Sequence, residues 1–129
     1  MLAIDTNLVV RYLTGDHPRQ SARARALIDG GSVFVAVTVM LEIDWVLRSA
    51  YGVRPGDVAR ALRAFAGLPT VTVEDEAAVA TALDRGENGM DFADALHLGR
   101  SLHCRGFATF DRGLVKAARA PGHGDVREA

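Results

Sequence analysis

Four carboxylates stand in the sequence at places where an acid needs an explanation. Asp5 ends the first apolar run of the chain, and Asp111 directly follows a later apolar run. Glu42 falls about one turn into a predicted helix, and Asp94 interrupts a stretch of small and apolar residues. Carboxylate oxygens suit Mg²⁺ or Mn²⁺, and a metal held by them can activate water for phosphodiester cleavage. These four acids therefore predict a divalent-metal site with phosphodiesterase chemistry.

Two of these acids, Asp111 and Glu42, also have an ordinary structural explanation. Asp111 can cap a turn or a helix, and Glu42 can be a solvated helix residue, as we expect for Asp44. Asp91 is predicted to be a helix N-cap, and it lies three residues before Asp94, on the same helix face. Carboxylates gathered without a cation repel and raise one another's pKa. The metal site therefore depends on whether the acids converge.

Helices and strands that alternate along the chain must position these acids. The pattern predicts a three-layer α/β/α sandwich with a mainly parallel sheet of four to five strands, in which ligands bind beyond the carboxyl ends of the strands. The expected strands are 2–5, 32–37, 71–73 and 106–110, with Val126 in a last edge strand, and the expected helices are 7–13, one ending near 29, 39–51, 55–66, 75–85, 92–104 and 114–119, followed by a loop at 122–124.

Capping residues and apolar stripes support the expected helices. Asp16 is predicted to cap the second helix and Thr38 the third. Met40, Ile43, Leu47 and Ala50 form an apolar stripe on the third helix, and Val58, Leu62 and Phe65 form one on the fourth. Because Asp5 ends an apolar strand, we expect that strand to be central in the sheet.

Composition limits the class of protein. The chain of 129 residues is 49% hydrophobic and 24% charged, which predicts one folded domain over residues 1–129. The single cysteine excludes an intrachain disulfide. No apolar run approaches the roughly 20 residues of a membrane span, and the N-terminus lacks the pattern of a signal peptide. We therefore expect a cytoplasmic protein with no membrane association.

Charge is distributed unevenly although the net charge is only −1. Residues 1–63 carry 8 Arg and 6 acids, whereas residues 64–129 carry 7 basic residues and 10 acids. This asymmetry would result if arginines of the first half bind phosphate and acids of the second half bind metal. Two solvated faces of unequal charge would produce it as well, so both interpretations stay open.

Four motifs together resemble the PIN-domain ribonucleases, and specifically the VapC-type toxins of toxin–antitoxin modules. These motifs are the segment Ile4-Asp5-Thr6-Asn7, the acid Glu42, the segment 91–97 and the segment 109–111. The resemblance spans nearly the whole chain. It implies a PIN-like fold, Mg²⁺- or Mn²⁺-dependent cleavage of cellular RNA, a homodimer, and inhibition by a small VapB-like antitoxin.

The resemblance also implies roles for individual residues. Asp5, Glu42, Asp94 and Asp111 become the catalytic metal ligands, and Asp91 has a possible supporting role. Beside them, Thr6, Asn7 and Thr109 would orient the acids or bind metal-coordinated water, or would simply cap helices and turns. Near the expected site, Arg11 and Arg112 can contact RNA or the antitoxin, or can be ordinary surface residues.

Two other functions remain open from the residues themselves. An aspartyl phosphatase of the haloacid dehalogenase type also begins with an Asp after the first strand. That chemistry requires a second Asp where Asn7 stands, and a positioned lysine, while Lys116 is the only lysine of the chain. The third possibility is a metal-free α/β module that only binds a partner.

Overall fold

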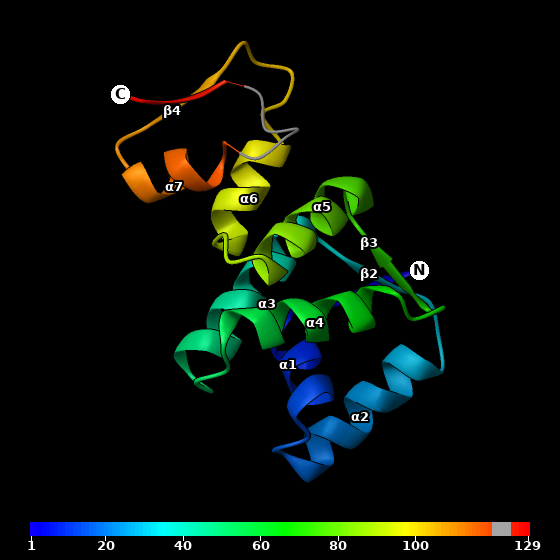
Figure 1. Ribbon diagram of the computed structural model, residues 1–129. Coiled ribbons are helices and arrows are strands. Elements are labelled where there is room, and N and C mark those ends of the chain that lie inside the picture. The colour runs from blue at the N-terminus through cyan, green and yellow to red at the C-terminus, as the bar shows by residue number, and fades with distance from the viewer. Residues whose placement is uncertain (120–124) are drawn as a thin grey trace.

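Three apolar segments pair into a parallel sheet on the side of the molecule where the N-terminus lies (Figure 1). A computed structural model describes residues 1–119 and 125–129. Strand β1 (Leu2–Ala3) pairs with β2 (Val33–Val35), which pairs with β3 (Val71–Val73). Every strand is short, and β2 alternates buried with half-buried residues. The parallel strands and the helices between them confirm the predicted α/β class.

Seven helices are defined among the described residues, and their bounds lie close to the expected ones. The fourth matches residue for residue. In chain order they are α1 (Thr6–Thr14), α2 (Pro18–Asp29), α3 (Val37–Ser49), α4 (Pro55–Ala66), α5 (Glu76–Glu87), α6 (Phe92–Gly99) and α7 (Arg112–Ala117). Gly15 ends α1 with a φ of 66°, a left-handed conformation that glycine adopts without strain.

The core lies between the sheet and the helices α1 to α6. Helices α4 and α5 pack against β3, and α1 packs against α2 and α3. Of the predicted apolar stripes, that of α4 is fully buried, while that of α3 is buried except at Ala50. The largest fully buried side chains include Ile28, Met40, Ile43, Leu62, Phe65 and Leu83.

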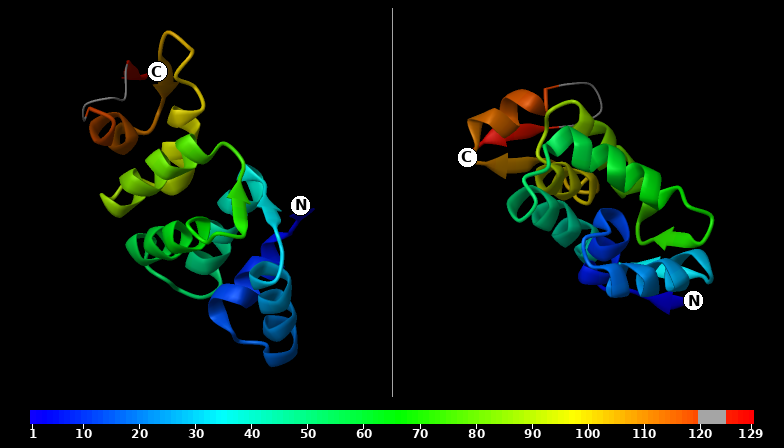
Figure 2. Two further views of the ribbon diagram at one scale, coloured as in Figure 1. Left: turned by 90° about the vertical axis from the view of Figure 1, so that its right-hand side faces the viewer. Right: turned by 90° about the horizontal axis from the view of Figure 1, so that it is seen from below.

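The last two strands do not join this sheet. Strand β4 (Phe107–Thr109) pairs in parallel with β5 (Val126–Glu128), and with α7 these strands form a C-terminal part that α6, packed against α5, connects to the rest of the molecule (Figures 1 and 2). The prediction of one sheet with four to five strands is therefore wrong. Helix α6 ends at Gly99 rather than near residue 104, and the exposed turns that follow it lead the chain away from the first sheet.

The separation of the sheets changes the setting of Asp5. Strand β1 pairs only with β2 among the described strands, and 53% of Leu2 is exposed. The strand before Asp5 is therefore an edge strand, contrary to the expected central position. The predicted edge strand at Val126 is present as β5.

Two predicted caps are also wrong. His17, not Asp16, caps α2, since His17 Nδ1 accepts a hydrogen bond from the Gln20 backbone at 3.2 Å. Helix α3 begins two residues early, so Ala36 takes the cap position predicted for Thr38. The predicted loop at 122–124 lies outside the described residues. Within the described residues, no helix is both long and apolar enough to cross a bilayer.

Candidate active site

Asp5 lies between β1 and α1 and begins the helix. Its backbone is extended, with φ −94° and ψ 168°, and its Oδ1 accepts a hydrogen bond from the Thr6 backbone N–H at 2.7 Å. The capping contact uses one carboxylate oxygen and leaves Oδ2 available. The residue is exposed, so the carboxylate is accessible to an ion or a substrate.

Thr6 connects Asp5 to the second predicted acid. The Thr6 side chain is buried at 4% exposure, and its hydroxyl donates to Glu42 Oε1 on α3. Because α1 and α3 pack together, this contact holds Glu42 beside the start of α1. This hydrogen bond is consistent with the expected role of Thr6 in orienting an acid.

Asp91 and Asp94 lie at the start of α6. Asp91 Oδ2 accepts the Asp94 backbone N–H at 3.1 Å, which confirms the predicted N-cap. Burial raises the pKa of Asp94 above its ordinary value, and the charges of Asp91 and Asp111 raise it further, while His97 lowers it. Asp94 therefore lies in a field of negative charge that a bound cation would relieve.

Asp111 caps the next helix in the same manner. Its Oδ1 accepts the Leu114 backbone N–H at 3.0 Å at the start of α7. Thr109 Oγ1 accepts the backbone N–H of Asp111 at 3.0 Å, so Thr109 shapes the turn that carries this acid. The charge of Asp111 also contributes to the raised pKa of Asp94.

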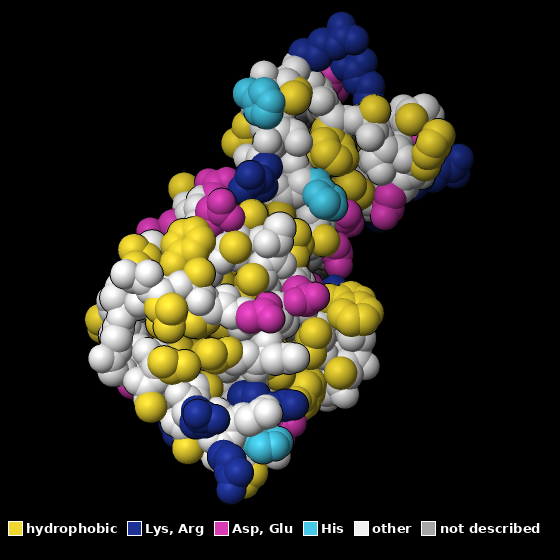
Figure 3. Space-filling view, turned by 180° about the vertical axis from the view of Figure 1, so that it is seen from behind, with side chains coloured by type: hydrophobic (Ala, Val, Ile, Leu, Met, Phe, Trp, Pro, Cys, Tyr) yellow, Lys and Arg dark blue, Asp and Glu magenta, His cyan; other side chains and the backbone are white. Residues whose placement is uncertain are grey.

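The acids thus form two groups. We call Asp5 and Glu42 the first acidic group, and Asp91, Asp94 and Asp111 the second acidic group. Figure 3 shows acidic side chains at the middle of one face and along the narrower region that leads to the C-terminal part. Within the described ranges, no three His, Cys, Asp or Glu side chains are close enough to hold one ion.

The donor set nevertheless fits a hard divalent cation. Both groups consist of carboxylates, which Mg²⁺ and Mn²⁺ favour over nitrogen or sulfur ligands. Neither oxygen of the Asp94 side chain receives a hydrogen bond from the described residues. A bound cation would offset the charges of Asp91 and Asp111 that help to raise the pKa of Asp94.

A buried ion pair lies directly behind the second acidic group. Asp44 is only 3% exposed, so its predicted solvated position is wrong. Its carboxylate accepts two hydrogen bonds from Arg48 Nε, at 3.1 and 3.2 Å, and one from Arg48 Nη2 at 2.8 Å. Arg48 Nη2 also lies 3.9 Å from Asp91 Oδ1. Sequence reasoning missed this pair, although the i, i+4 spacing of Asp44 and Arg48 indicated it.

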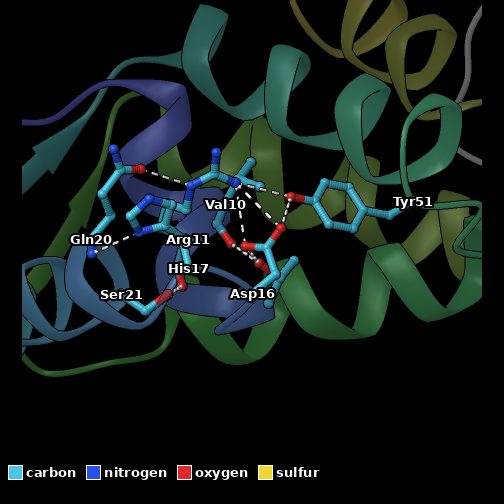
Figure 4. Close-up of polar contacts among 8 residues, drawn as sticks. Val10, Arg11, Asp16, His17, Gln20, Ser21 and Tyr51 are labelled. Carbon is cyan, nitrogen blue, oxygen red and sulfur yellow. Dashed lines mark hydrogen bonds and ion pairs between the residues drawn. The ribbon is translucent and has the colours of Figure 1, made fainter.

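The two predicted arginines differ in their surroundings. Arg11 Nε donates to Gln20 Oε1 at 2.9 Å, and its Nη1 contacts Asp16 Oδ1 at 3.3 Å and the Tyr51 hydroxyl at 3.1 Å (Figure 4). Arg112 is 85% exposed in its side chain and pairs with Glu128 at 3.0 Å. Arg11 is therefore fixed in place on the body that carries the first acidic group.

Comparison with protein families supplies an independent observation. The model of the family described as PIN domain matches residues 2–120 of the chain. This match includes every acid of both groups. No curated protein matches the chain significantly.

Proposed function

The chain belongs to the PIN domain family, whose members are generally metal-dependent nucleases, and we propose that it is an endoribonuclease that uses Mg²⁺ or Mn²⁺. Asp5, Glu42, Asp94 and Asp111 hold one or two ions in this proposal. The observation that carries it is the position of the acids at helix starts, where Thr6 joins Asp5 to Glu42 and the charges of Asp91 and Asp111 help to raise the pKa of Asp94.

The residues of the chain divide the work between them. A divalent ion, when bound, supplies an activated water and neutralises charge on the phosphodiester in the transition state. Thr6 keeps Glu42 beside Asp5 through its hydroxyl. Thr109 and Asp91 keep Asp111 and Asp94 in place through backbone contacts at the starts of α7 and α6. Asn7, in the first turn of α1, binds metal-coordinated water.

The finer assignment in this proposal is the toxin of a toxin–antitoxin module, active in the cytoplasm on cellular RNA. The motif resemblance to VapC-type toxins supports it. A VapB-like antitoxin and a second copy of the chain are its proposed partners.

The decisive experiment replaces one acid of the first group. Asp5→Asn should abolish cleavage of RNA in Mg²⁺ or Mn²⁺ while the circular dichroism spectrum stays that of the parent, because Asn keeps the cap but not the charge. The matched control is Asp84→Asn, which changes an exposed acid on α5 that pairs with Arg63 of α4. The proposal fails if Asp5→Asn cleaves at the parent rate.

A second measurement addresses the toxin assignment. Induced expression of the parent should arrest growth of a bacterial host, whereas Asp5→Asn should permit normal growth. Growth arrest that persists with Asp5→Asn contradicts an RNA-cleaving toxin, since the loss of one metal ligand removes the chemistry.

A further inference from the structure

A shallow groove lies between α1 and α2, and it begins at Asn7, two residues after Asp5 of the first acidic group. It has a volume of about 280 Å³, and its lining includes Asn7, Arg11 and Arg23. Asn7 directly follows Asp5 and Thr6 in the first turn of α1, and Arg11 lies one turn further along the same helix face. The groove is therefore continuous with the surface that carries Asp5.

Two arginines of α2 lack ion-pair partners among the described residues, and one of them, Arg23, lines this groove. Arg19 and Arg23 are exposed and lie four residues apart on α2, where two like charges disfavour the helix. Among the described residues, no ion pair joins either of them to a carboxylate, whereas Arg11, Arg60, Arg63 and others are paired. An external polyanion would offset this unbalanced charge.

The face seen in Figure 3 carries Lys and Arg side chains at its lower end and also at its upper end. Lys and Arg side chains cluster over its lower region, which α1 and α2 form, and acidic side chains lie above them at the middle. One strand of nucleic acid lying along this face would present phosphates to the arginines and to the metal-binding acids in turn.

The floor of the groove is apolar. Leu8 is half-buried, Ala24 is buried, and 42% of Leu27 is exposed. Unpaired bases have apolar faces that can lie on such a floor, whereas a double helix stacks its bases inside and offers only its backbone and groove edges. The combination of apolar floor and basic rim fits a single strand better than a duplex.

We propose that the groove between α1 and α2 binds the backbone of single-stranded RNA next to the cleavage site. Arg23 contacts a phosphate directly, Arg19 extends the contact by one helical turn, and Arg11 is held ready by Gln20 and Asp16. Leu8 and Leu27 contact bases. The inference rests on the proposed ribonuclease function, since it supplies the substrate site of that same activity.

Binding of a labelled single-stranded RNA of mixed sequence, measured in EDTA over a range of salt concentrations, tests the groove. Arg23→Gln should weaken binding about tenfold, the effect of one charge-assisted contact. The slope of log K against log salt should also become shallower by about 0.7, as for one released counterion. Combining Arg23→Gln with Arg19→Gln should roughly double the change in slope.

The matched control is Arg105→Gln. Arg105 is exposed between α6 and β4, away from the groove, and it has no ion pair among the described residues. It should bind RNA with the affinity and slope of the parent. Equal losses in Arg105→Gln and Arg23→Gln, or an unchanged slope in Arg23→Gln, overturn the proposed groove.

The same assay separates the groove from the chemistry. Without metal it measures binding alone, so Arg23-dependent binding by a protein that never cleaves RNA would sustain the groove and end the ribonuclease proposal. Cleavage of RNA by a protein whose RNA binding does not depend on Arg23 would sustain the ribonuclease proposal and end the proposed groove. A poly-glutamate peptide is the competing probe, and Arg23-dependent binding of that peptide without binding of RNA contradicts the RNA assignment.

Discussion

Asp94 is the residue whose surroundings most directly predict a measurable change. Burial and the charges of Asp91 and Asp111 raise its pKa above the ordinary 3.8. The folded state therefore binds the proton more tightly than the unfolded state does. The metal-free protein loses this part of its stability as pH rises from about 3.8 through the raised pKa.

Replacing Asp94 with Asn should remove that loss. In EDTA at pH 7 we expect Asp94→Asn to be more stable than the parent, because the neutral amide carries no charge into the second acidic group. The advantage should shrink as pH falls through the raised pKa and be gone below about 3.8, where the parent carboxyl is protonated in both states. Urea unfolding at a series of pH values measures it. A parent that is the more stable protein at pH 7 would contradict the assignment.

Asp44 and Arg48 allow a second test at the residue scale. Arg48→Met leaves a carboxylate at 3% exposure without its guanidinium, and removing one partner of a buried pair costs about 3–5 kcal/mol. Arg60→Met is the matched control, because Arg60 is 63% exposed and its pair with Asp57 should contribute no more than about 1 kcal/mol. Denaturant unfolding measures the free energy of unfolding of both variants. Equal losses would mean that the buried pair stabilises the protein no more than the exposed pair does.

At the scale of elements, helix starts position most of the acids. Asp5, Asp91 and Asp111 are the N-caps of α1, α6 and α7, and each cap contact engages one carboxylate oxygen. Capping and ion binding are therefore compatible in one residue, and the two explanations weighed for Asp111 do not exclude each other.

Two substitutions of Asp111 separate these roles. Asp111→Asn should keep the stability of the parent, because Asn caps helices as well as Asp does, whereas Asp111→Ala should lose about 1 kcal/mol. Both variants should lose RNA cleavage, since neither retains the carboxylate charge. Thermal unfolding and a cleavage assay measure the two effects. Retained cleavage in Asp111→Asn would reduce Asp111 to a structural cap.

At the scale of the molecule, the first acidic group belongs to the body with β1 to β3, and the second lies at the base of the C-terminal part. An ion shared by both groups would join the two parts. Binding only to the folded protein at a metal concentration of 100 times Kd adds about 2.7 kcal/mol of stability. Mg²⁺ or Mn²⁺ should therefore raise the Tm of the parent.

Variants of each group show whether the ion is shared. Asp5→Asn and Asp111→Asn should each lose most of the metal-induced shift in Tm, while Asp84→Asn on α5 should keep it. If Asp111→Asn alone loses the shift, the second group binds the ion independently, and the shared site is wrong. Calorimetric melts of all four proteins with metal and with EDTA make this comparison.

Local signals in the sequence determined most elements and several roles within them. Proline and apolar spacing placed α4 at the observed bounds, and Asp91 was correctly assigned as a cap. Such features depend on residues within a few positions of one another, so the sequence alone contains them. The PIN-domain resemblance follows from the order and spacing of four short motifs, and the family match confirms it.

Tertiary structure alone decided how these elements meet. Strand β4 pairs with β5 instead of β1, and Thr6 contacts Glu42 on another helix. Asp44 is buried and pairs with Arg48, four positions away. These contacts join residues at least four positions apart, and most of them are far more distant. A strand segment presents the same hydrogen-bonding groups to any partner, so its sequence does not specify the neighbour. The acids were therefore predictable as residues, but their division into two groups depends on packing between distant parts of the chain.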